Sequence, residues 1–263
     1  MASSSSSVNA RPWGGSTVHQ RRLREVWRSA GWPCQDLVEV ELLAAGLLER
    51  VRQPSGHETL RVTDAGLLVL DATLQRNRAR RDAHEALVER VVREMARAGR
   101  IAWRGLSLRA RVGEGDAGAW MMAMPDVFSI RHTTVEDYVE PAVHEIKVTR
   151  ADLLSDLRHP HKSRAYHALS SHCWYVLKAG IAEVDEIPAG FGVIFAAARG
   201  DADGELDVAR PAPRRAMRLP LGTWMALARA NAEPAADAQA QAWLTDLQSN
   251  SEHATNDPAG DDA

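Results

Sequence analysis

The sequence predicts an α+β protein, in which a mixed sheet flanked by helices follows a small helical unit. Apolar residues recur at helical spacing through much of residues 17–99. Later runs such as "HCWYVLKAGI" are short and rich in β-branched and aromatic residues, which is typical of strands. The chain has 263 residues, of which 45% are hydrophobic and 25% charged, so it fits one large domain or two small ones.

The first predicted unit spans residues 17–75, after residues 1–16, which we expect to be a disordered lead-in. Its expected elements, in chain order, are a helix from Thr17 to Gly31, a helix from Asp36 with Gly46 near its end, a strand–turn–strand over residues 47–64 with the turn at Pro54–Gly56, and a closing helix from Asp64.

This unit resembles the winged-helix family, on the marks "LLAAGLLERV" and "LRVTDAGLLVL". A winged helix that reads DNA carries basic or amide side chains on its recognition helix. Here that stretch has Asp36, Glu39 and Glu41, and no Lys or Arg from Cys34 to Leu48. Acids facing a polyanion lower affinity. We therefore expect packing or a protein contact from this helix, whereas the first helix has arginines that can touch phosphates.

The second predicted unit spans residues 82–230 and follows a basic segment, "RNRARR" at 76–81, which is either a solvated linker or a phosphate contact. Its expected elements, in chain order, are a helix over 82–99, the strands "AWMMAMPDVFSI" and "PAVHEIKV", a helical stretch over 149–171 broken near Pro160, the strands "HCWYVLKAGI", "GFGVIFAAA" and "GELDVAR", and a last helix that opens at Pro220.

Two opposite charges interrupt the apolar strand "PAVHEIKV". Side chains alternate between faces, so Glu145 and Lys147 share one face, with Cα atoms about 7 Å apart, while His144 and Ile146 point the other way. If the preceding strand pairs antiparallel with this one, Asp126 faces Glu145. Two carboxylates repel unless a cation lies between them, and a nearby lysine can orient a water molecule. This combination predicts metal-assisted hydrolysis of a phosphodiester.

"PD" at 125–126 followed by "EIK" at 145–147 resembles the PD-(D/E)xK nuclease superfamily, whose core is restriction-endonuclease-like. Residues 82–230 more closely resemble the MmcB-like family of DNA-repair nucleases, through "MPDVFSI", "HEIKVTRADLLSDLRHPHKSRAY", "CWYVL" and "EIPAGFGVI". The resemblance implies Mg²⁺ or Mn²⁺ held by Asp126, Glu145 and the backbone carbonyl of Ile146. It also implies that Lys147, an exposed site charge, positions the attacking water.

The resemblance implies three further roles near this site. Lys162 and Tyr166, four residues apart on one helical face, are either phosphate or strand contacts, or a surface lysine and a half-buried tyrosine. Relatives often add an acid from the first helix of the domain. Glu85 and Glu89 are candidates, and His84 fits that slot about as well, so a third carboxylate and a second metal stay open.

We therefore expect a metal-dependent DNA endonuclease of DNA repair or processing, with DNA as partner and a possible protein partner at the winged-helix-like unit. The alternative is a non-catalytic DNA- or protein-binding module, a regulator or adaptor, on a nuclease fold. A zinc site among His159, His161, His167, His172 and Cys173 is disfavoured, because their spacing matches no usual zinc pattern.

Charge is unevenly distributed along the chain. The formal net charge is −3, but residues 231–263 contain seven acids and no Lys or Arg, so the rest has a balance of +4. We expect an acidic, disordered tail that is either merely solvated or competes for basic surface. Two distant cysteines favour a cytoplasmic location, and no apolar run approaches the length that spans a membrane.

Overall fold

The computed structural model of the protein describes residues 13–113, 118–197 and 206–234. The chain divides into two compact units, residues 1–81 and residues 82–263. The expected disorder of residues 1–12 and 235–263 concerns segments outside the described residues. Within the expected lead-in, Ser16 caps the first helix, and Trp13 packs against the core of the N-terminal unit.

The N-terminal unit contains the helices and the hairpin that its sequence predicts. Its elements are α1 (Thr17–Arg28), α2 (Leu37–Ala44), β1 (Leu48–Arg52), β2 (Glu58–Val62) and the start of α3 (Asp64–Arg97). The strands β1 and β2 pair antiparallel, with Leu48 opposite Val62. A core of buried aliphatic side chains, including Leu23, Leu42 and Leu60, holds the helices against the hairpin.

Helix α3 differs from the expectation of two helices joined by a linker at 76–81. It runs without a break over 34 residues, so "RNRARR" is helical. The physical reason lies in composition, because Arg and Ala are strong helix formers and neither Gly nor Pro stands between Gly66 and Gly99. The hydrophobic stripe pauses at 76–81, but nothing there stops a helix.

The C-terminal unit holds the larger sheet. Its elements are β3 (Arg100–Arg104), β4 (Leu108–Val112), β5 (Ala119–Ala123), β6 (Val127–Arg131), the 3₁₀ turn η2 (Glu136–Tyr138), β7 (Ala142–Lys147), α4 (Arg150–Leu157), α5 (Pro160–Leu169), β8 (His172–Lys178), the 3₁₀ turn η3 (Val184–Glu186), β9 (Gly192–Ala196), β10 (Leu206–Arg210) and α6 (Leu221–Arg229).

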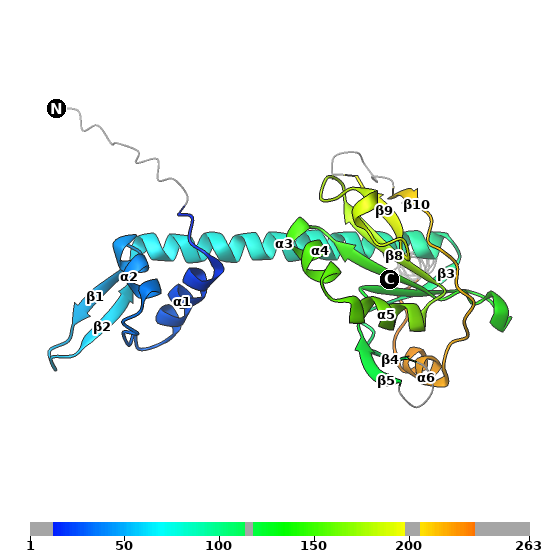
Figure 1. The fold of residues 1–263 in the computed structure, drawn as a ribbon, viewed down its shortest axis with the longest axis horizontal. Coiled ribbons are helices and arrows are strands. Elements are labelled where there is room, and N and C mark those ends of the chain that lie inside the picture. The colour runs from blue at the N-terminus through cyan, green and yellow to red at the C-terminus, as the bar shows by residue number, and fades with distance from the viewer. Residues whose placement is uncertain (1–12, 114–117, 198–205, 235–263) are drawn as a thin grey trace, which may run out of the picture. The chain divides into compact units, whose positions relative to one another are not determined.

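The sheet has six strands in the order β10-β9-β8-β7-β6-β3 and is mixed. Strand β7 pairs antiparallel with β6 and parallel with β8. The parallel pair is connected through α4 and α5, which begin at Arg150 and at Pro160 as the break near the proline predicts. Strands β4 and β5 form a separate hairpin that contacts α5 and α6 (Figure 1).

Each face of the sheet is covered. Residues 87–92 of α3 pack on the face that carries Val127, Ile146 and Val176. Helices α4, α5 and α6, with the β4–β5 hairpin, pack on the face that carries Phe128, Val143 and Tyr175. The fold is therefore α+β, a mixed sheet flanked by helices, as the sequence predicts.

Two strands of this unit were not expected, and one expected strand is divided. Strands β3 and β4 lie in the stretch between α3 and β5, which the sequence reasoning left without structure. The run "AWMMAMPDVFSI" forms β5 and β6, which belong to different sheets. Pro125 lies between them, and a residue without a backbone N–H ends a ladder readily. Among the described residues, no helix combines the length and apolarity needed to span a membrane.

Candidate active site on strands β6 and β7

Asp126 and Glu145 lie beside each other because β6 and β7 are antiparallel. Val127 is the register partner of His144, and one further step places Asp126 next to Glu145. The backbone amide of Ile146 donates a hydrogen bond to Asp126 Oδ2 at 2.7 Å, which ties the start of β6 to β7. The alternation expected along β7 is also present, since Ile146 packs in the opposite core, on α3.

Glu145 is almost fully buried and accepts three hydrogen bonds. Lys147 Nζ and Lys162 Nζ both donate to Oε1 at 2.5 Å. The hydroxyl of Tyr166 donates to Oε2 at 2.7 Å. Lys162 and Tyr166 come from successive turns of α5, so the helical face expected from their spacing points at Glu145. Two ammonium groups and a hydroxyl therefore compensate for the burial of the negative charge on Glu145.

Lys147 is less accessible than the sequence reasoning expected. Its side chain is only 11% exposed, and it reaches Glu145 from the same strand face. The strand places it between the covering helices and the sheet, where its ammonium group also lies 3.9 Å from Asp156 Oδ1. The expectation that Lys147 is an exposed site charge is therefore wrong, because its ammonium group is mostly buried and paired with Glu145.

Asp156 and Tyr175 complete the cluster. Asp156 Oδ1 accepts from Lys162 Nζ at 2.7 Å, and Asp156 Oδ2 accepts from the Tyr175 hydroxyl at 2.7 Å. Tyr175 lies on β8 directly beside Glu145 in the parallel register. Asp152 and Asp156 are four residues apart in the sequence, a spacing that allows a position near the rim of the metal site. Sequence reasoning did not place Tyr175 in the site, because it looked like an ordinary core residue.

His84 is the residue of α3 that reaches the site. Its Nε2 lies 3.4 Å from Asp126 Oδ1. Glu85 lies next to it, and both line an open pocket of about 420 Å³ together with Arg104 and Asp126. Glu89 instead lies 3.8 Å from Arg104. Of the candidates left open on this helix, the imidazole contacts Asp126 and the two carboxylates do not.

The electrostatics of the cluster follow from these contacts. Pairing with Asp126 raises the pKa of His84 above its ordinary value. Burial would raise the pKa of Asp126, but His84 and the Ile146 amide outweigh it and hold that pKa below its usual range. Burial would lower the pKa of Lys162, but its contacts with Glu145 and Asp156 outweigh burial and raise that pKa above its ordinary value. Burial and the negative Glu145 raise the pKa of Tyr166, so its hydroxyl stays a donor.

The carboxylate oxygens of Asp126 and Glu145 are the kind of ligand atom that a hard cation such as Mg²⁺ prefers. Within the described contacts, Glu145 Oε2 receives a single hydrogen bond, from Tyr166, and a carboxylate oxygen has about two lone pairs. Asp126 Oδ1 faces His84 at 3.4 Å. Mg²⁺ takes one or two carboxylates and completes its shell with other oxygens. Within residues 13–113, 118–197 and 206–234, no cluster of three or more His, Cys, Asp or Glu side chains is placed to hold a metal ion.

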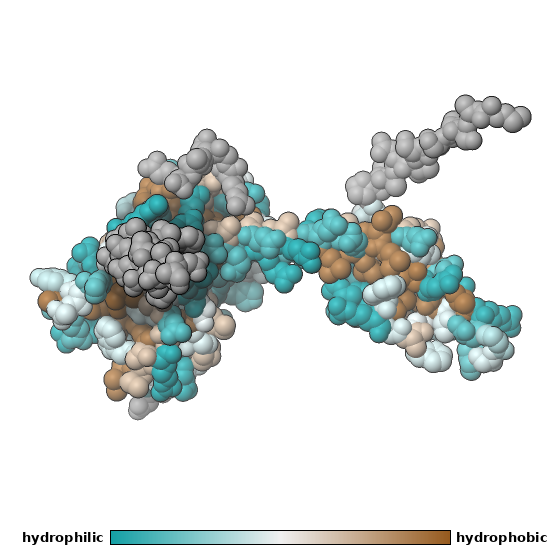
Figure 2. Space-filling view, turned by 180° about the vertical axis from the view of Figure 1, so that it is seen from behind, coloured by the Kyte–Doolittle hydropathy of each residue, from teal (hydrophilic) through white to brown (hydrophobic). Residues whose placement is uncertain are grey.

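The acids of α2 have structural partners in the N-terminal unit. Glu39 is fully buried and accepts hydrogen bonds from the amides of Cys34 and Gln35 at 2.6 and 2.9 Å. Asp36 caps α2, and Glu41 contacts His19. The exposed face of α2 instead carries Leu37 and Val40. Figure 2 shows hydrophobic surface on this unit.

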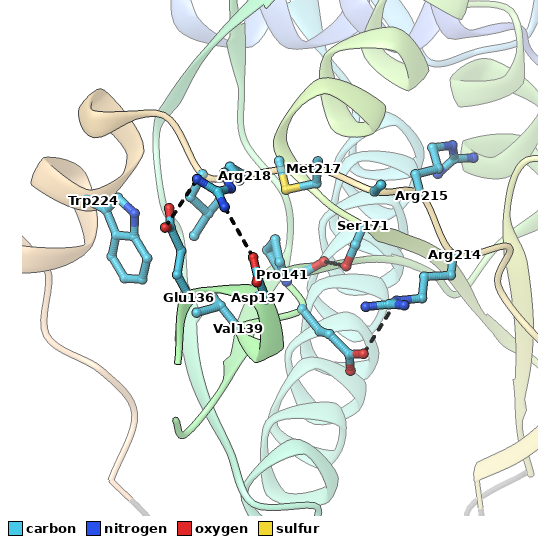
Figure 3. Close-up of a pocket in the computed structure, with 13 residues that line it drawn as sticks. Glu136, Asp137, Val139, Pro141, Ser171, Arg214, Arg215, Met217, Arg218 and Trp224 are labelled. Carbon is cyan, nitrogen blue, oxygen red and sulfur yellow. Dashed lines mark hydrogen bonds and ion pairs between the residues drawn. The ribbon is translucent and has the colours of Figure 1, made fainter. Parts of the chain in front are cut away.

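A second hollow, of about 450 Å³, lies between η2 and the segment before α6 (Figure 3). It has arginines on one wall and carboxylates on the other. The two walls pair with each other: Arg218 with Glu136 and Asp137, and Arg214 with Glu140. These charges on the two walls are therefore matched within the hollow.

No family model and no curated protein matches the chain. Among solved structures, a protein of unknown function from Silicibacter pomeroyi aligns with a TM-score of 0.37 and 14% identity. The alignment covers 66% of this chain and 94% of that one.

Proposed function

We propose that the chain is a Mg²⁺- or Mn²⁺-dependent DNA endonuclease that hydrolyses phosphodiester bonds in DNA repair or processing. One observation supports this above the others. Asp126 and Glu145 stand side by side on β6 and β7, with Lys147 in contact with Glu145, in the arrangement that the PD…EIK pattern requires. A restriction-endonuclease-like identity for the sheet, MmcB-like membership and a cytoplasmic location belong to the same proposal.

Each residue of the cluster then has a role. Asp126, Glu145 and the carbonyl of Ile146 would hold the cation, which would neutralise negative charge on the phosphoryl group and lower the pKa of a bound water. Tyr166 orients the Glu145 carboxylate through Oε2. Lys147 positions the attacking water. Lys162, whose side chain is 34% exposed, is the ammonium group most accessible to a substrate phosphate.

The site is polar but partly closed to water, which strengthens these interactions. Lys147 and Asp156 are each 11% exposed, so their charges are poorly screened. Asp156 accepts a hydrogen bond from Lys162, and Tyr175 donates one to Asp156, so Lys162 is held by Asp156 as well as by Glu145. Such supporting contacts fix the directions of the groups that meet substrate.

Cleavage assays test the proposal directly. Purified protein is incubated with single-stranded, nicked and branched DNA and Mn²⁺, alongside Glu145→Ala and Asp126→Asn. We expect cleavage of at least one substrate by the wild type and none by either variant. Asp185→Ala, at an exposed acid on η3, is the matched control and should cleave normally. Equal behaviour of wild type and Glu145→Ala on every substrate would remove the nuclease proposal.

The rival function is a non-catalytic binding module built on the same fold. Two observations favour it. An exposed apolar face on α2 is expected of a protein contact, and the three hydrogen bonds to Glu145 are expected of a structural polar network. A module would bind DNA or a protein without cleaving DNA. The same assays, run beside DNA binding in EDTA, separate the two functions.

A further inference from the structure

Arg104 ends β3 at the rim of the pocket that contains Asp126. Its register partner on β6 is Val127, the residue after Asp126. Arg104, His84 and Asp126 line the same open pocket. A guanidinium group beside a candidate phosphodiesterase site is well placed to bind a DNA phosphate, because its fork matches two phosphate oxygens at once.

A carboxylate of the chain already occupies that fork. Glu233 accepts two parallel hydrogen bonds, from Arg104 Nε at 2.7 Å and from Arg104 Nη2 at 3.0 Å. The backbone amide of Glu233 also donates to the carbonyl of Ala102 at 2.8 Å, which fixes the segment after α6 along β3. The expectation of a merely solvated tail from residue 231 is therefore wrong at Glu233.

The pair remains accessible to solvent. The side chains of Arg104 and Glu233 are 35% and 23% exposed, so a competing anion can reach them. Pairing with Glu233 raises the pKa of Arg104. A DNA phosphodiester carries the same single negative charge as a carboxylate and offers the guanidinium the same two-pronged contact, so it can replace Glu233 on Arg104.

We propose that Arg104 is a phosphate-binding residue of the site and that Glu233 occupies it in place of a DNA phosphate until DNA enters. This inference rests on the proposed function, because it takes the pocket to receive DNA. It assigns Glu233 the role of an internal competitor, and it gives the first acid of residues 231–263 a specific contact.

A double-mutant cycle in DNA binding tests the pair. Fluorescence anisotropy with a labelled single-stranded oligonucleotide, in EDTA, compares wild type, Glu233→Gln, Arg104→Gln and the double variant in the full-length chain. Glu233→Gln should bind about two- to fivefold more tightly. Arg104→Gln should make the log–log salt slope shallower by about 0.7, the value for one phosphate contact on a single strand. In the Arg104→Gln background Glu233→Gln should have no effect.

Glu186→Gln is the matched control, because Glu186 makes the same two-pronged contact with Arg150, at 3.0 and 2.7 Å, and does not line the pocket. It removes one acid without uncovering Arg104 and should leave affinity unchanged. An equal gain in this control would show a general charge effect and overturn the proposal. Unchanged affinity in Glu233→Gln, wild-type affinity in Arg104→Gln, or no binding by any variant would overturn it too.

Cleavage is measured separately on the same variants in Mn²⁺. The binding cycle carries the inference whether or not DNA is cut, so a module that binds DNA without hydrolysing it can still pass. Loss of the nuclease proposal would appear in the Glu145→Ala comparison, and loss of this inference would appear in the Glu233→Gln comparison. Thermal unfolding of all variants shows whether any of them is misfolded.

Discussion

Glu145 is the residue that decides how the cluster is interpreted. It is only 2% exposed and lies between two ammonium groups and a tyrosine hydroxyl. A buried carboxylate with fewer partners would cost several kcal/mol, so its neighbours have a structural role whatever the function. The same side chain is a metal ligand in the nuclease proposal. Mutational effects on stability must therefore be measured apart from effects on activity.

Lys147→Ala should lower stability modestly. It removes one of the two ammonium groups at Glu145 Oε1, while Lys162 remains as a counter-charge. We expect the free energy of unfolding in urea to fall by about 1–3 kcal/mol, the cost of losing a hydrogen bond to a buried charged group. Lys178→Ala, at an exposed lysine that ends β8, serves as the control and should change little. Equal losses in the two variants would show that the Lys147–Glu145 contact contributes nothing.

Tyr166→Phe tests the other oxygen of Glu145. The hydroxyl lies 2.7 Å from Oε2 and 3.1 Å from the Met124 carbonyl, and its single proton goes to the nearer, charged acceptor. Removing it should cost about 1–3 kcal/mol in chemical denaturation. Tyr138→Phe, at a tyrosine that is 62% exposed, should be neutral. A stable Tyr166→Phe would mean that Oε2 finds another donor.

At the scale of elements, residue patterns predicted most of the fold. The bounds of α1, α4, α5 and α6 follow caps, glycines and prolines in the sequence, and β7 and β8 follow β-branched runs. The antiparallel pairing of β6 and β7, which the site requires, is confirmed. These elements were predictable because local chemistry sets their ends.

Elements set by distant contacts were not predictable in the same way. The strand β3 has Arg at both ends, and it forms because β6 pairs with it and α3 covers it. The site network has the same character, since Asp156 reaches Lys162 and Tyr175 only once α4, α5 and β8 pack together. Sequence spacing finds Asp126, Glu145 and Lys147 but does not show how many donors surround Glu145.

Gly31→Ala should destabilise the N-terminal unit more than Gly46→Ala does. Both glycines have positive φ, of 73° and 69°, which costs an alanine about 1–2 kcal/mol. At Gly31 a Cβ atom would also lie 2.0 Å from the Leu60 carbonyl oxygen, whereas at Gly46 nothing lies within 4 Å. Hydrogen exchange of the β1 and β2 amides measures the difference. Equal exchange in the two variants would contradict a close approach of Gly31 to β2.

At the scale of the whole molecule, stability comes from separate cores in the two units and from one sheet that is buried on both faces. Strand β7 of this sheet carries a buried histidine. His144 on β7 is 2% exposed and stacks on Trp174, with ring centroids 6.4 Å apart. Among the described residues its Nδ1 has no hydrogen-bond partner. Burial, with the nearby charges of Arg100 and His172, lowers the pKa of His144 to about 3.

Stability should therefore fall as the pH drops below neutrality. An imidazole whose pKa is depressed in the folded state stays neutral there, while the unfolded chain takes up a proton near the ordinary pKa of about 6.5. The contribution of His144 is present above that pH and is lost at about 1.4 kcal/mol per unit down to about pH 3. The raised pKa of His84 acts in the opposite direction. The stability that it contributes is present at low pH and is lost as the pH rises.

His144→Phe isolates this effect in urea denaturation between pH 7 and pH 5. Relative to the wild type, the variant should become more stable as the pH falls, because it has no proton to take up at this position. Identical pH slopes would contradict the buried neutral imidazole. A titration of the His144 ring by NMR checks the same point in the wild type, where the ring should remain neutral at pH 5.

Binding of Mn²⁺, measured by calorimetry at neutral pH, tests most directly whether Asp126 and Glu145 share a cation. We expect the wild type to bind the ion, Asp126→Asn and Glu145→Gln to lose that binding, and Asp185→Ala to keep it. Wild-type protein that releases no heat with Mn²⁺, or variants that bind the ion as the wild type does, would contradict a metal centre at these two strands.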